Sequence, residues 1–229
     1  MRKFLNPPPL LSTTVNKKGA VLYTETSTHI SPSKLSGFVR LVPTKPQMSD
    51  EVVKTVSEGF IQPITETLTE DVRQHLEDCH FGFSFIDGRD TFAGFAIFKV
   101  IDRFLYLSGG IMRPAYQGSG LINVAVLMAQ AITGSPLFAL RTQSPLMWSA
   151  GRRLTREWLP QLGVTDHVMA EETRKLADKL GMSSTVVPGF YNGPLYGEKP
   201  QHKDAELQGW WDSICSFERG DAVLCSGRF

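Results

Sequence analysis

Alternation of apolar and polar residues predicts β structure in the middle of the chain. Segment 81–85 carries phenylalanine at every second position, and two longer apolar runs follow at 92–101 and 104–112. Only an Asp-Arg pair separates those two runs, which predicts an antiparallel hairpin with a tight turn. Within the second run, Gly109-Gly110 predicts either a β-bulge that curves the sheet or a close approach of another backbone.

Helical patterns lie on both sides of this hairpin. Ser49 and the two acidic residues after it predict the start of one helix, and a second helix is expected to begin near Thr69. Segment 118–133 is apolar nearly all round, which predicts a helix buried against a sheet, and 136–142 has the pattern of a short buried strand. A strand, a buried helix and a second strand in succession predict a βαβ crossover with parallel strands.

The last third of the chain predicts two further helices, a long loop and two closing strands. The helices are expected at 145–158, which begins with proline, and at 171–180, which ends before a glycine. Proline, glycine and tyrosine fill a loop at 183–203, and strands are expected near 211–217 and 222–229. A loop of this length is either part of a binding site or a cover over the core.

Composition divides the chain into an arm and one domain. Residues 1–37 are rich in proline, serine, threonine and lysine and lack periodicity, so we expect an extended N-terminal arm with one short strand at 20–24. Residues 38–229 form a single predicted domain, because a chain of this length buries a sizeable core without metal or disulfides.

Charge and cysteine usage narrow the classes of partner. The formal net charge of the 229 residues is +1, which favours neither nucleic acid nor an anionic membrane as a partner. No apolar stretch is long enough to span a bilayer, and the prolines at 7–9 interrupt any signal-peptide core. The three cysteines are widely separated, and no spacing of a metal site occurs. We therefore expect reduced thiols, no metal and a cytoplasmic protein.

The most informative segment runs from 111 to 122. It leaves the second strand of the hairpin, turns at a proline, passes two glycines and enters the apolar helix. Glycines allow several backbone N–H groups to converge, and the helix N-terminus adds a partial positive charge, so the segment suits a diphosphate. A P-loop would need a lysine here, and a dinucleotide fingerprint would need a glycine at Asn123 and an acid at Arg141. The other interpretation is a plain strand-to-helix connection.

The order of these features resembles the GNAT superfamily of acyl-CoA-dependent N-acyltransferases over residues 38–155. The loop of that family reads Gln/Arg-x-x-Gly-x-Gly/Ala after Val-x-Pro. This chain has Met-Arg-Pro at 112–114 and Gln-Gly-Ser-Gly-Leu-Ile at 117–122, with isoleucine in the last, small-residue place. The resemblance implies an α+β fold in which a mixed central sheet holds the antiparallel hairpin and the parallel βαβ crossover, with helices on both faces.

The resemblance also implies acetyl-CoA or another acyl-CoA as cosubstrate. Its pantetheine amides would pair with a strand end that the neighbouring parallel strand leaves free. Ser144 either donates a hydrogen bond to pantetheine, where many members have asparagine, or only caps the helix that it starts. The expected CoA-binding residues are Ile111, Met112, Arg113, Gln117, Gly118, Ser119, Gly120, Leu121, Ile122 and Ser144.

Tyr106 and Ser149 are the candidate catalytic residues. Tyr106 stands where many members carry a glutamate base, and it either orders a water, lines the acceptor site or only packs in the core. Ser149 lies in the helix where the family often has a tyrosine that protonates the departing thiolate. Tyr191 and Tyr196 of the long loop are further candidates for that proton.

The predicted function is transfer of an acyl group, with acetyl the expected one, from acyl-CoA to a primary amine of a small molecule or peptide in a ternary complex. The alternative is a catalytically inactive CoA-binding protein of the same fold, because the usual glutamate and tyrosine are missing. A nucleotide-binding oxidoreductase is a weaker third interpretation. The pattern leaves open a homodimer.

Overall fold

The computed structural model describes most of the chain beyond the N-terminal arm. The described residues are 12–15, 21–24, 28–30, 39–161 and 167–229. The structure therefore describes three short segments of the predicted arm 1–37, and the rest of the arm lies outside the described residues. The three segments are β1 (Ser12–Val15), β2 (Val21–Thr24) and β3 (Thr28–Ile30), so the expected strand near 20–24 is present and two others accompany it.

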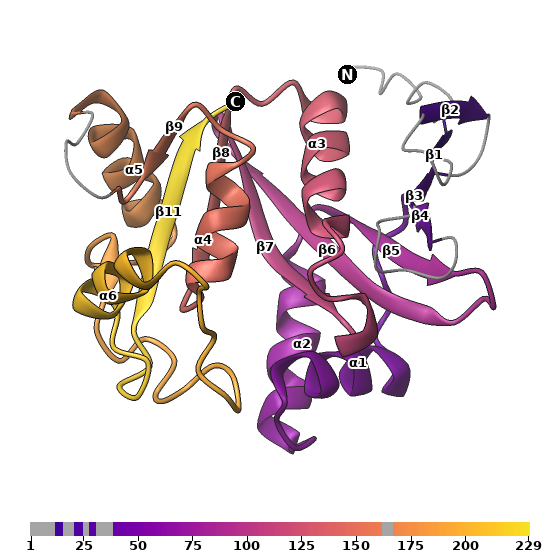
Figure 1. The fold of residues 1–229 in the computed structure, drawn as a ribbon, viewed down its shortest axis with the longest axis horizontal. Helices are drawn as coiled ribbons and strands as arrows, with labels where there is room; N and C mark the ends of the chain where they lie inside the picture. Colours follow the sequence, from indigo (N-terminus) through magenta and orange to yellow (C-terminus); the bar gives the residue numbers. More distant parts are fainter. Residues whose placement is uncertain (1–11, 16–20, 25–27, 31–38, 162–166) are drawn as a thin grey trace, which may run out of the picture.

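One mixed sheet organises the molecule (Figure 1). Its strand order is β10-β11-β8-β7-β6-β5-β4-β3-β1-β2, and β9 pairs with β11. Most neighbours are antiparallel, whereas β7 and β8 are parallel and join through a helix, so the expected hairpin and βαβ crossover are confirmed. The remaining strands are β4 (Val39–Val42), β5 (Phe81–Asp87), β6 (Phe92–Ile101), β7 (Phe104–Met112), β8 (Leu137–Thr142), β9 (Glu157–Leu159), β10 (Val186–Val187) and β11 (Ala222–Arg228).

The β7 strand carries a bulge close to the point where its pairing with β8 ends. Ile97 of β6 faces Gly109, but the next residue of β6, Phe98, faces Leu107. Ser108 is therefore the extra residue of a β-bulge, as the paired glycines indicated. The parallel pairing of β7 with β8 ends at Leu107 and Leu140, so no described strand pairs with the later residues of β7 on that side.

Helices cover both faces of the sheet, as expected. They are α1 (Asp50–Phe60), α2 (Glu66–Asp78), α3 (Leu121–Thr133), α4 (Pro145–Arg152), α5 (His167–Lys179) and α6 (Ala205–Ile214). One face bears α3, α4 and α6, and the other bears α1 and α2 towards β6 and α5 towards β11 (Figure 1). No described helix is long and apolar enough to cross a membrane.

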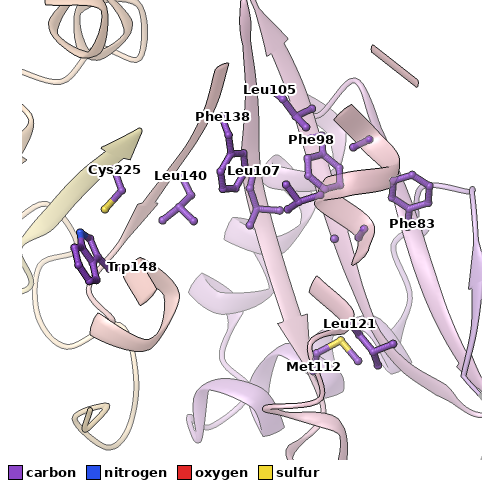
Figure 2. Close-up of a cluster of buried hydrophobic side chains, with 14 of the residues drawn as sticks. Phe83, Phe98, Leu105, Leu107, Met112, Leu121, Phe138, Leu140, Trp148 and Cys225 are labelled. Atoms are coloured by element: carbon purple, nitrogen blue, oxygen red, sulfur yellow. The ribbon is translucent and has the colours of Figure 1, made fainter. Parts of the chain in front are cut away.

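Alternate residues of the central strands build the core on each face. Leu105 and Leu107 of β7 point towards α3 and α4, whereas Tyr106 points to the side of α5. Figure 2 shows the first cluster, in which Leu107 lies near Phe98 and Phe138. This period-2 division explains why the strands were readable from alternation alone.

The segment 211–217 is a helix end and not the predicted strand. Asp204 caps α6 by accepting hydrogen bonds from the N–H groups of Glu206 and Leu207, at 3.0 and 3.2 Å. Leu207, Trp211 and Cys215 then recur every fourth residue and face the same core cluster. The prediction was wrong because a short apolar run with tryptophans suits both the period of a strand and that of a helix. The cap at Asp204 decides for the helix.

Two predicted helix limits and the predicted burial of α3 also need correction. The helix from 145 ends at Arg152 instead of 158, because Gly151 packs against the ring of Trp158, which belongs to β9. The second helix begins at Glu66, since Thr65 and not a residue near Thr69 provides the cap. The apolar helix α3 is buried on one side only: Leu127 and Ile132 are 49% and 54% exposed.

A buried carboxylate joins the loop at 183–203 to the C-terminal strand. Asp221 is fully buried and accepts hydrogen bonds from the N–H groups of Gly189 (3.0 Å) and Ser216 (2.8 Å). Its carboxylate also accepts two hydrogen bonds from Arg219, at 2.6 and 2.7 Å. The hydrogen bonds from Arg219, assisted by those backbone N–H groups, lower the pKa of Asp221 to about 2.

We expect Asp221→Asn to lower the free energy of unfolding at neutral pH by roughly 1–3 kcal/mol, because charge-assisted hydrogen bonds to buried groups are lost. The folded pKa of about 2 lies below the ordinary 3.8. This stabilisation is therefore complete above about pH 4 and is lost as the pH falls towards 2. Urea unfolding of both proteins across this range tests it. Asp178→Asn, an exposed control on α5, should change stability little, and equal effects of the two substitutions would contradict the assignment.

Candidate functional site

The turn between β7 and α3 is open. After a short 3-10 turn at Pro114–Tyr116, the chain reaches Gly118 and Gly120, whose φ angles are 70° and 81°. Glycine adopts this left-handed region without the penalty that a side chain brings. A Cβ at either position would meet no atom within 4 Å, so no described side chain packs against these two glycines.

Several polar groups of this turn have no hydrogen-bond partner in the described part of the chain. The backbone N–H groups of residues 118–123 have no hydrogen-bond acceptor in the described part of the chain, as is usual for the first turn of a helix. The Ser119 hydroxyl oxygen is buried and also lacks a partner there. A buried hydroxyl without a partner is costly, and beside a helix N-terminus it fits a bound anion such as a diphosphate.

Two of the predicted CoA-binding side chains hold the turn in place. Gln117 donates to the carbonyl oxygens of Gly59 and Met112, at 3.2 and 3.1 Å. Arg113 donates to Thr55 Oγ1 at 3.2 Å and lies 3.3 Å from the carboxylate of Glu58. Both side chains therefore bind the turn to α1 and not to the opening.

The apolar members of the predicted set belong to the core. Met112 and Leu121 are buried side by side (Figure 2), and Ile111 packs with α1 and α2. Ile122 is half-buried and lies beside Gly110, where it would be 3.3 Å from an added Cβ. These residues can contact a ligand through their backbone, while their side chains support the turn from behind.

A cavity of about 500 Å³ occupies the space where β7 and β8 separate. Its floor is formed by residues 106–111 of β7 and 140–142 of β8, and α1 and α2 line one side. Residues 190–196 of the long loop close the other side. The expected gap between the parallel strands thus exists, and it continues as a half-open cavity on the face that bears α2 and α5.

The loop at 183–203 is a fixed wall of this cavity. Gln62 donates to the carbonyl oxygens of Pro194 and Leu195, at 3.1 and 2.9 Å, which ties the loop to α1. On the other side, buried Gln143 at the end of β8 accepts from the N–H of Leu195 at 2.8 Å. The loop is therefore held at both rims of the cavity.

Tyr106 lies at the cavity floor. It is 3% exposed, and burial raises the pKa of its hydroxyl above the ordinary value. The phenol is therefore neutral at physiological pH and is a hydrogen-bond donor instead of a base. Tyr106, Ser108 and Arg141 also border a second, shallower cavity of about 790 Å³ between α2 and α5.

Ser144 and Ser149 lie outside the linings of both cavities. The N–H of Ser144 donates to Thr142 Oγ1 at 2.9 Å, and its own hydroxyl makes no capping bond to α4. Ser149 Oγ is 3.0 Å from His202 Nε2, while His202 Nδ1 accepts from the N–H of Asp204. That acceptor role places the proton on Nε2, so His202 donates to Ser149 and cannot activate it.

His75 is a cavity residue that the sequence reasoning missed. It lies on α2 and borders both cavities. Its Nδ1 is 2.9 Å from the carbonyl oxygen of Asp71, one turn earlier. A carbonyl oxygen only accepts, so Nδ1 carries the proton and Nε2 keeps a free lone pair. The sequence signal was its helical spacing with Asp71 and Leu68, which places all three towards the cavity.

The comparisons with known proteins concern the fold alone. No protein-family model matches the sequence, and no curated protein matches it. Many of the solved structures that resemble it are GNAT-family acetyltransferases. An aminoglycoside 6'-acetyltransferase type Ii is 9% identical, covers 82% of this chain and 96% of its own, and has a TM-score of 0.47.

Two further structures are similar over a shorter part. The PaiA N-acetyltransferase of Thermoplasma acidophilum, in complex with coenzyme A, is 15% identical over 56% of this chain and 93% of its own, with a TM-score of 0.40. A GNAT-family acetyltransferase of Staphylococcus aureus Mu50 is 11% identical over 56% and 94%, with a TM-score of 0.41. Likenesses at this level say nothing about activity, which has to be argued from the geometry of this chain.

We expect Gln143→Leu to loosen the loop wall. Gln143 is 2% exposed, and the change removes the acceptor of the Leu195 N–H and one of the two hydrogen bonds to the carbonyl oxygen of Phe217. Stability should fall by about 1–3 kcal/mol, and amide hydrogen exchange should accelerate around Leu195. Gln143→Glu is the matched control, because it keeps a side-chain oxygen that accepts from the N–H of Leu195. Amide exchange at Leu195 should therefore be slower in this variant than in Gln143→Leu. Equal protection in both variants would contradict the assignment.

Proposed function

We propose that this protein is an N-acyltransferase that uses acyl-CoA as its donor. The observation that carries the proposal is the separation of β7 from β8 directly below an open glycine turn. The separation leaves a strand edge for an extended amide-bearing chain, and the turn offers N–H groups to phosphate. These two features follow one another along the chain, the free edge first and the turn after it, and match the two polar parts of coenzyme A.

The diphosphate of CoA would lie on the turn. The N–H groups of residues 118–122 and the hydroxyl of Ser119 are its proposed donors, and the N-terminus of α3 adds a favourable field. The pantetheine amides would pair with the free edge of residues 108–112 of β7. When bound, acyl-CoA supplies a thioester whose carbonyl carbon an amine can attack, so that a C–N bond forms, the C–S bond breaks and the thiolate leaves.

The amine must lose a proton in this reaction. An alkyl amine is almost wholly protonated at neutral pH, so a group that accepts the proton raises the reactive fraction. We assign this role to His75, whose Nε2 has a free lone pair and whose ring is held by the Asp71 carbonyl.

The buried Tyr106 hydroxyl has a different proposed role. Because burial raises its pKa, it stays protonated and would donate a hydrogen bond within the cavity, or hold a water there. The proton for the departing thiolate would come from the loop tyrosines, Tyr191 or Tyr196, which line the cavity. Ser149 remains a candidate for that step, although it lies outside both cavity linings and already accepts from His202.

The acceptor would be a primary amine of a small molecule or of a peptide. The fixed loop wall and the 500 Å³ volume are those of a small-molecule site. One observation favours the alternative of a CoA-binding protein without catalysis: a buried tyrosine occupies the place where the related family often has a carboxylate base. Acyl transfer to a panel of amines by the purified chain, after CoA binding has been shown, separates the two.

We expect Gly120→Glu to abolish CoA binding, because its side chain would place a negative charge in the opening of the turn. The matched control is Gly134→Glu at the other end of α3, where φ is 65° and an added Cβ also meets no atom within 4 Å. The two variants share the backbone strain and differ in position. Isothermal titration with CoA should show loss only for Gly120→Glu. Retained affinity in that variant, once it is shown to be folded, would argue against the turn as the phosphate site.

We expect His75→Gln to lower kcat for acyl transfer by about a hundredfold or more, because general-base catalysis contributes that much. CoA affinity should not change. His80→Gln is the control, since His80 lies just beyond α2, is exposed and borders neither cavity. Unchanged turnover in folded His75→Gln would assign the proton to water instead.

A further inference from the structure

Arg141 introduces a positive charge into the cavity floor. It follows Leu140, the last residue of β8 that pairs with β7, and its half-buried side chain borders both cavities. Ser108 of β7 borders both cavities together with Arg141. Four residues of strand, about 13 Å, lead from Ser108 to Met112, after which the chain enters the glycine turn. The guanidinium therefore serves a part of the ligand other than the diphosphate.

This guanidinium has no carboxylate partner within the described residues, which sets it apart. The other half-buried arginines among the described residues all pair with acids. Arg73 pairs with Glu70 and Glu77, Arg113 with Glu51 and Glu58, and Arg228 with Glu157. Burying a charge is costly unless it is paired. Within the described residues, the cost of burying the Arg141 charge is met by aromatic contacts and by Asp71 at longer range, and not by an ion pair.

Aromatic groups hold the guanidinium in a defined orientation. Its central carbon lies 4.1 Å from the centre of the Phe190 ring and 5.8 Å from that of Tyr191. Stacking on a ring leaves the edge of the planar guanidinium available, and this edge matches a carboxylate in a bidentate arrangement.

The surroundings indicate what carries such a carboxylate. Phe60, Leu68, Phe95 and Tyr196 line the same cavity, so the body of the ligand has apolar surface. We infer that the cavity binds a small carboxylate-bearing molecule with an apolar body, whose carboxylate rests on Arg141. The inference extends the proposed function by naming the substrate class of the same site. The carboxylate belongs either to the acceptor amine or to the acyl chain of the donor, since both meet near this part of β7.

Binding in the absence of CoA tests Arg141 independently of the proposed activity. Phenylalanine and phenylalaninamide have the same apolar body, and only the first bears a carboxylate. Isothermal titration of the full chain should show at least about tenfold tighter binding of phenylalanine, as expected for a charged hydrogen bond. Arg141→Met should remove this preference, and Arg141→Lys should keep part of it.

Arg152→Met provides the matched control for folding and for overall charge. Arg152 also lies over an aromatic ring, 5.4 Å from the centre of the Trp148 ring, but it is exposed and borders neither cavity. This variant should keep the full preference for the carboxylate. Near-ultraviolet circular dichroism of the Arg141 variants shows whether the aromatic wall is intact.

The source of the carboxylate is then read from acyl transfer. If the wild type, with acetyl-CoA as the donor, acylates phenylalanine faster than phenylalaninamide and Arg141→Met loses this difference in rate, the carboxylate belongs to the acceptor. With 2-phenylethylamine as the acceptor, faster transfer from succinyl-CoA than from acetyl-CoA in the wild type, lost in Arg141→Met, assigns the carboxylate to the acyl chain. A folded Arg141→Met protein that matches the wild type in every one of these comparisons overturns the inference.

Failure of the proposed function gives a different result. If the wild type does not bind CoA but still binds phenylalanine through Arg141, the donor assignment fails and the carboxylate site stands. If the wild type binds CoA and transfers acyl groups without any effect of Arg141, the enzyme stands and the carboxylate site fails.

Discussion

The site depends on one constraint, namely that two parallel strands stop pairing before either of them ends. The bulge at Ser108 shifts the register of β7, and its last parallel pair is Leu107 with Leu140. Backbone groups beyond this point need partners from water or from a bound chain. The cavity, the free strand edge and the position of Arg141 in the cavity lining all result from this separation. The glycines next to the bulge also leave that edge without bulky side chains.

The parts of the fold that could be predicted are those in which two local signals agree. The limits of β6 and β7 match the apolar runs at 92–101 and 104–112, because alternation and a two-residue turn indicate the same hairpin. The glycine turn was readable for a similar reason, since positive φ angles at Gly118 and Gly120 restrict the residue type. The residue types along each segment therefore determine both the hairpin and the glycine turn, without contacts distant in sequence.

The parts that could not be predicted depend on contacts distant in sequence. Arg141 comes from β8 and His75 from α2, and only the folded sheet brings them to the same cavity wall. Nothing near Arg141 in sequence shows that it lacks an acidic partner. The helix at the end of the chain was missed because its period-4 apolar face was short, and the exposed side of α3 was hidden by a sequence apolar nearly all round.

The same contacts that complete the fold also set the shape of the site. Gln62 and Gln143 tie the loop wall to α1 and to β8, and Asp221 fixes its start to the last strand. A wall held at so many points does not open easily, because each release leaves a polar group without its partner. The shallower cavity between α2 and α5 shares Tyr106 and Arg141 with the cavity where the strands separate. The charge of Arg141 at this junction attracts a carboxylate in either cavity, so that attraction and final position depend on the same side chain.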